Sequence, residues 1–261
     1  MRTAAAERLG NFDADPGTPV LGAVDGRRLD LAVRLALLVL RPIEFADDAY
    51  CRLGPLGPPQ VRAMAIHPAF GAPVNRALSH AIGFDALTFS PDMMTRLTSS
   101  ARSRLAVLLV TEPTDVVKRV ASMLAAAVLS RRVLRLVLKN ERARVRQTMG
   151  DDGFHIAIHE APLLHSVLAE LDRDTADTAM LADGSDEVER RERVVAFGFA
   201  VIGRFLDATE PVLADLLAGR LPPGVGYDER DRMVQRLSDI HCEHVVKLVR
   251  RRQRSWLASI D

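Results

Sequence analysis

The stretch from 114 to 164 constrains the fold most, because it contains one proline, Pro162, and two glycines, Gly150 and Gly153. Within it, residues 120–129 are apolar nearly all the way round a helix. A helix of that composition needs cover on several sides, which predicts that it lies at the centre of a helical bundle. Gly150 predicts a helix end, and Pro162 predicts a kink or an early end to the next helix.

The segment from 131 to 149 predicts one amphipathic helix with a basic stripe. At 100° per residue, one side is apolar and carries Val133, Leu134, Val137, Leu138 and Val145. The other side carries the candidate partner-binding residues, which are Arg131, Arg132, Arg135, Lys139, Arg142 and Arg146. The alternative is a solvated or salt-bridged face without a partner. Glu141 falls on the apolar side, where it would pair with an arginine or face a partner.

Composition argues for a globular protein of the cytoplasm. Thirty-five basic residues stand against 34 acidic ones, which disfavours a dedicated nucleic-acid or membrane-surface protein but leaves a local patch open. Two cysteines, Cys51 and Cys242, provide no disulfide framework and suit a reducing compartment. The longest apolar runs are too short to span a bilayer.

The whole chain predicts an all-α fold, a compact multi-helix bundle around a central amphipathic helix. We expect a mobile N-terminal segment over 1–26 and a single helical domain over 27–261. A solvated, partly disordered acidic connection is expected at about 172–190. Beyond the central stretch, helices are expected over 31–40, 61–64, 73–82, 91–109, 194–206, 211–217 and 229–260. No segment has the alternation of a strand.

The motifs of common enzyme sites are missing from the sequence. There is no phosphate-binding glycine loop, no dinucleotide fingerprint, no serine nucleophile elbow and no Cys-x-x-Cys pair. His155 and His159 have the spacing of helical zinc ligands, but Ile156 stands where zinc proteases have a glutamate. His241 and His244 form a second pair, and neither pair has evident third and fourth ligands. We therefore expect no cofactor, no metal and no catalytic residue.

Four pieces of the chain resemble the accessory subunit of the type III secretion sorting platform, the SctK (YscK) family. Residues 41–45 look like that family's Arg-Pro-x-x-aromatic step, 221–223 like its late Leu-Pro-Pro, and Trp256 like its C-terminal tryptophan. Residues 131–164 are similar to its central block of a basic helix with an inward glutamate, a glycine turn and an aromatic helix with paired leucines. The matching residues there are Arg132, Leu138, Glu141, Gly150, Phe154, Ala161, Leu163 and Leu164.

The resemblance implies a non-enzymatic, all-helical cytoplasmic adaptor. Its partners would be the pod protein SctQ and the cytoplasmic domain of the inner-membrane ring protein SctD, and indirectly SctL and the ATPase SctN. Such a protein would lie at the cytoplasmic face of the inner membrane through these partners, without inserting in the membrane and without binding nucleic acid. Two alternatives stay open: a helical nucleic-acid-binding regulator using the stripe from Arg131 to Arg146 or the C-terminal basic cluster, and a metal-dependent helical enzyme using His155 and His159.

Overall fold

The computed structural model describes residues 26–82, 84, 90–174, 179–182, 186–222, 225, 230–256 and 260. This part of the chain is helical and contains no sheet, only two isolated bridges, so the all-α prediction is confirmed. The expected mobile segment lies outside the described residues except for Gly26, with which the first helix begins.

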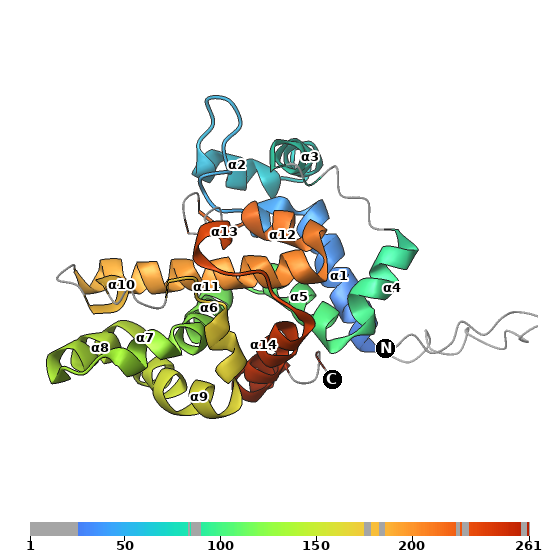
Figure 1. The fold of residues 1–261 in the computed structure, drawn as a ribbon. Coiled ribbons are helices and arrows are strands. Elements are labelled where there is room, and N and C mark those ends of the chain that lie inside the picture. Colours follow the sequence, from blue (N-terminus) through green and yellow to red (C-terminus); the bar gives the residue numbers. More distant parts are fainter. Residues whose placement is uncertain are drawn as a thin grey trace, which may run out of the picture.

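Figure 1 shows the order of the helices along the chain. The first group is α1 (Gly26–Leu40), η1 (Pro42–Glu44), α2 (Pro58–Ala65), α3 (Gly71–Ile82), α4 (Pro91–Ser99) and α5 (Ala101–Thr111). The central group is α6 (Thr114–Val128), α7 (Ser130–Arg135), α8 (Lys139–His155), the π-helical η3 (Ile156–Glu160), α9 (Ala161–Leu164) and η4 (Ser166–Glu170). The last group is α10 (Ala179–Ala182), α11 (Glu187–Thr209), α12 (Pro211–Ala218), α13 (Arg230–Met233), α14 (Asp239–Arg252) and η5 (Arg254–Trp256).

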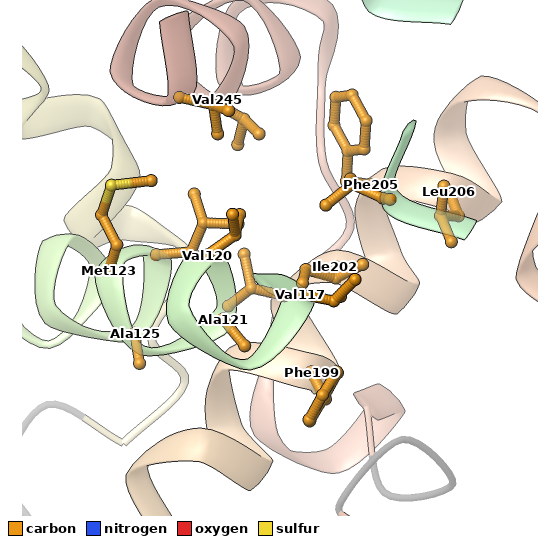
Figure 2. Close-up of a cluster of buried hydrophobic side chains, with 14 of the residues drawn as sticks. Val117, Val120, Ala121, Met123, Ala125, Phe199, Ile202, Phe205, Leu206 and Val245 are labelled. Carbon is orange, nitrogen blue, oxygen red and sulfur yellow. The ribbon is translucent and has the colours of Figure 1, made fainter. Parts of the chain in front are cut away.

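The core is built around α6 and α11. Every residue from 123 to 129 is buried, as the all-round apolar composition of this segment predicts. Figure 2 shows Val117 of α6 beside Ile202 of α11, and Val245 of α14 on the side of α6 that carries Val120 and Met123. Because α6 is buried by α11, α14 and its own neighbours in sequence, it is the central helix of the bundle.

The two central helices approach each other closely at Gly198. A Cβ atom built on Gly198 would lie 2.0 Å from the carbonyl oxygen of Ala121 and 2.3 Å from its carbonyl carbon. No side chain fits in that space. Glycine in the middle of a long helix is disfavoured by about 1 kcal/mol relative to alanine, so its presence here reflects helix packing.

A smaller second core lies under α2 and α3. It is formed by apolar side chains that include Ile43, Cys51, Val61 and Leu78, and Figure 1 shows α2 and α3 on one side of the bundle. Arg62 ties this region together, because its guanidinium donates to the carbonyl oxygens of Ile43 and Ala46 at 2.8 and 3.1 Å.

Three helices expected to be continuous are interrupted. The 91–109 helix breaks at Ser100, whose hydroxyl accepts from the Ser103 amide at 3.0 Å and so starts α5. The last helix breaks before α14, where Ser238 and His241 form a capping box. The 131–149 helix ends at Arg135 and restarts at Lys139, since Leu136 and Leu138 have extended backbone angles. Side-chain caps and burial of individual residues override the periodic pattern at these points.

The expected solvated connection at 172–190 is wrong at both of its ends. The Asp172 side chain is fully buried against Arg132, and α11 begins at Glu187, capped by Asp186. Within α11, Arg190 is buried and donates to the Thr148 hydroxyl of α8 at 3.2 Å. Of the residues between, 175–178 and 183–185 lie outside the described part of the chain.

Candidate partner-docking surface

The break between α7 and α8 exposes large apolar side chains. Leu134 is 46% exposed, Val137 is 85% exposed and Leu138 is 56% exposed, while Leu136 between them is buried. The sequence pattern assigned the three exposed residues to the buried side of one helix. At the extended turn 136–138 only Leu136 enters the core, so Val137 and Leu138 are exposed there, next to the exposed Leu134 of α7. Exposed apolar residues gathered within one turn are typical of an interaction surface, whereas isolated ones are ordinary.

Basic side chains surround this exposed turn. Arg131 and Arg135 lie on α7 before it and Lys139 lies on α8 directly after it, and all three are exposed. We call the surface formed by Leu134, Val137, Leu138, Arg131, Arg135 and Lys139 the junction surface. The structure therefore brings three of the six predicted partner-binding residues to one place, together with apolar residues that the sequence interpretation had placed inside.

Arg132 does not belong to this surface. Its side chain is 5% exposed, and it donates from Nε to Oδ2 of Asp172 at 2.6 Å and from a terminal nitrogen to Oδ1 at 2.5 Å. A buried cation requires a partner of this kind, because the interior offers no water to replace it. Arg132 is consequently a structural residue that joins α7 to the segment after η4.

The other two predicted residues lie further along α8 and are engaged locally. Arg142 donates from Nε to the carbonyl oxygen of Leu136 at 2.9 Å, which satisfies a backbone acceptor at the end of α7. Arg146 forms an exposed ion pair with Asp151 at 2.5 Å, across the non-helical Gly150. Hydrogen bonding to the Arg146 guanidinium lowers the pKa of the Asp151 carboxyl. Glu141 is half-buried in the first turn of α8 and makes no ion pair within the described part of the chain.

The π-helical turn η3 lies beside α7 and changes the direction of the chain before α9. The Ala161 amide donates to the carbonyl oxygen of Ile156, five residues back. Pro162 explains the widening, since it has no N–H to donate to Ile158 and its ring would clash with that carbonyl in a regular α-helix. The expected kink at Pro162 is thus a π-turn followed by the short helix α9, which ends at the exposed Leu163 and Leu164.

The histidine pairs serve packing and capping. The rings of His155 and His159 lie 5.1 Å apart between centroids, and in the described part of the chain no three His, Cys, Asp or Glu side chains are grouped to hold a metal. His241 accepts from the Ser238 amide at 3.1 Å as part of the α14 cap. His244 contacts His165 through their Nδ1 atoms at 3.3 Å. Burial raises the pKa of the neighbouring Cys242 thiol to about 11.

Comparisons with protein-family models, curated proteins and solved structures return no match for this chain. Among the described helices, none combines the length and the apolar composition needed to cross a bilayer.

One local signal pointed to the junction surface. Lys139-Asn140-Glu141 has the composition of a helix start, because asparagine favours a cap and an acidic residue favours the first turn. In the structure, the Asn140 side chain accepts from the Glu141 amide at 3.0 Å in the first turn of α8. Read as a start signal with Asn140 as the cap, these residues would have placed the break near 139–140, close to the observed N-cap Leu138, which has no side-chain cap hydrogen bond.

Proposed function

We propose that this protein is a non-enzymatic adaptor that uses the junction surface to dock a protein partner. The observation that carries the proposal is the exposure of Val137 and Leu138 inside a basic rim at the break between α7 and α8. Apolar contact excludes water at the centre of an interface, and charges at its rim select a partner of opposite sign. The expected partner therefore presents an apolar face bordered by acidic residues.

The resemblance to the SctK family suggests which assembly this adaptor serves. We propose that it links an SctQ-like pod protein to the cytoplasmic domain of an SctD-like ring protein in a type III secretion sorting platform. SctL and the ATPase SctN would then associate indirectly, and the protein would reside at the cytoplasmic face of the inner membrane through these contacts. The junction surface lies inside the central block that carries the resemblance, which supports the proposal.

The test is a pull-down of tagged protein from its native cells at physiological salt, with co-purifying proteins identified by mass spectrometry. Val137→Ser with Leu138→Ser is expected to reduce recovery of one partner at least tenfold, since it removes the apolar centre of the surface. The control is Ile66→Ser, directly after α2 and outside the junction surface, because Ile66 is 81% exposed and Val137 is 85% exposed. Circular dichroism checks that both variants keep their helical content.

The outcomes separate the alternatives. Loss of a pod or ring component only in the Val137/Leu138 variant supports both the surface and the assembly. Loss of an unrelated protein partner supports the docking surface and contradicts the secretion assignment. Co-purifying nucleic acid that is released by salt, with no protein partner, would contradict the adaptor and favour the nucleic-acid-binding alternative.

A further inference from the structure

A second candidate binding site lies between η3–α9 and the C-terminal end of α14. It is an open pocket of about 450 Å³ whose walls come from segments about 90 residues apart in sequence, and Figure 1 shows α9 beside α14. None of the residues that line it belongs to the junction surface. The pocket can therefore be tested without reference to the function proposed above.

The pocket carries an excess of positive charge. Its charged lining consists of three guanidinium groups, from Arg251, Arg252 and Arg254, and one carboxylate, from Glu160. Three positive charges against one negative charge leave two uncompensated. Arg251 and Arg252 lie in the last turn of α14, where the partial negative charge of the unpaired carbonyl groups favours cations.

The carboxylate of Glu160 forms ion pairs within the protein. Its side chain is 4% exposed, and Arg252 donates to its Oε2 atom from Nε at 2.8 Å and also from a terminal nitrogen. Arg251 approaches the other carboxylate oxygen through Nε at 3.3 Å. This buried pair fixes Arg252, whereas Arg251 keeps its two terminal nitrogens and Arg254 has no ion pair within the described residues.

The remaining lining is suited to a peptide more than to a free anion. Leu163 is 81% exposed and Leu164 is 45% exposed at the rim, which provides apolar surface next to the two available arginines. His155 and His159 add ring nitrogens that can hydrogen-bond a backbone or a carboxylate. Arginine binds carboxylates with two parallel hydrogen bonds, so a carboxylate beside an aliphatic side chain matches this arrangement.

We propose that this pocket binds an acidic peptide segment of a protein partner. A carboxylate of the segment pairs with Arg251 and Arg254, and a neighbouring aliphatic side chain packs on Leu163 and Leu164. The charge excess selects the acidic group, and the exposed leucines select a polypeptide over an inorganic anion. The site gives the chain a docking position separate from the junction surface.

The experiment measures fluorescence anisotropy of a labelled peptide, Gly-Asp-Leu-Asp-Leu-Gly, with the full-length protein. A matched peptide has Asn in place of both Asp residues. The protein variants are Arg251→Gln with Arg254→Gln, and as control Arg232→Gln with Arg236→Gln. Both control arginines are exposed and lie outside the pocket, Arg232 on α13 and Arg236 between α13 and α14. Both double variants remove the same charge, so a general electrostatic effect would affect them equally.

The expected result is saturable binding of the Asp peptide, at least tenfold weaker binding by the Arg251/Arg254 variant, and unchanged binding by the control. The Asn peptide is expected to bind at least tenfold more weakly to the unaltered protein. Equal weakening in both double variants, equal binding of both peptides, or full competition by inorganic phosphate at the peptide's own concentration would each overturn the proposal. If the double variant loses helical content, Leu163→Ser, at a largely exposed residue, replaces it with the same expected loss.

Discussion

Arg132 illustrates how a single residue can be misassigned from its charge. It sits among six basic residues that a helical wheel places on one face, yet its side chain is 5% exposed and paired with Asp172 across 40 positions of sequence. The pair lies where the chain leaves η4, next to a backbone bond from the Gln235 amide to the Leu171 carbonyl oxygen. Burying two charges removes their hydration, and their mutual attraction compensates for only part of that cost. The pair therefore fixes the position of α7 relative to the segment after η4 more than it adds stability.

Removing one member of this pair should lower the free energy of unfolding far more than replacing both members with apolar residues. Asp172→Ala removes the buried carboxylate that accepts two hydrogen bonds from the Arg132 guanidinium, and we expect the free energy of unfolding to fall by about 3–5 kcal/mol. Arg132→Met with Asp172→Leu should recover most of that loss, because similar volume is filled without a buried charge. Urea denaturation measures both.

The control for the buried pair is Asp151→Ala, which breaks the exposed Arg146–Asp151 pair and should change stability little. If Asp172→Ala costs no more than Asp151→Ala, the Arg132–Asp172 pair is not the structural contact described above.

At the scale of the helices, the contact between α6 and α11 requires a glycine at position 198, because no side chain fits there. Gly198 permits the backbone of α11 to lie against the carbonyl of Ala121, and Phe199 and Ile202 on the same helix are fully buried. A sequence pattern shows only that 194–206 is apolar and helical. It does not show which position touches the neighbouring backbone, because that depends on where two helices cross.

Gly198→Ala is expected to lower the free energy of unfolding by about 1–3 kcal/mol, even though alanine is the better helix former by about 1 kcal/mol. The added methyl group must displace α11 from α6, since the atom it meets is a backbone oxygen. For the same reason, Ala121→Gly should not restore stability in the double variant. Guanidinium denaturation of the three variants tests this, and a stabilised Gly198→Ala protein would contradict the close approach.

For the molecule as a whole, the C-terminal helix meets the rest of the bundle beside a histidine contact, where His244 of α14 lies 3.3 Å from His165 between their Nδ1 atoms. Burial, and then the neighbouring His244, lower the pKa of His165, while Glu160 opposes the shift and Arg251 and Lys247 add to it. Burial likewise lowers the pKa of His241, with Glu170 opposing and His244 adding. Protonation of His241 at Nδ1 would also abolish its acceptance of the Ser238 amide and hydroxyl that cap α14.

Global stability should therefore decrease with acid. For a histidine whose folded pKa lies below its unfolded value of 6.5, the unfolded chain binds more protons, so stability is full above about pH 7. It falls as the pH drops below 6.5 towards the lower folded pKa, by at most about 1.4 kcal/mol per pH unit for each proton taken up. Urea denaturation between pH 7.5 and 5.5 measures the slope.

His165→Gln should reduce this slope, because it removes one of the two shifted groups. A slope that is the same in the His165 variant and in the unaltered protein would show that another group causes the acid sensitivity.

The features that the sequence determined by itself are those with local causes. The all-helical class, the central position of 120–129, the start of α4 at Ser90-Pro91 and the non-helical Gly150 all follow from apolar periodicity, capping chemistry and backbone freedom. The end of α1 at Leu40 has the same kind of cause, since Pro42 follows it. Each depends on residues within a few positions of one another, so a single sequence suffices to predict it.

Only the tertiary structure decided which side chains of the central block face outward. Leu134, Val137 and Leu138 are exposed and Arg132 is buried, the reverse of what one continuous helix would give. The reversal arises because Asp172, distant in sequence, pairs with Arg132, and because the turn at 136–138 lets Leu136 reach the core. A helical wheel gives the direction of each side chain around one helix axis, whereas the burial of that side chain depends on which other segments of the chain pack against the helix.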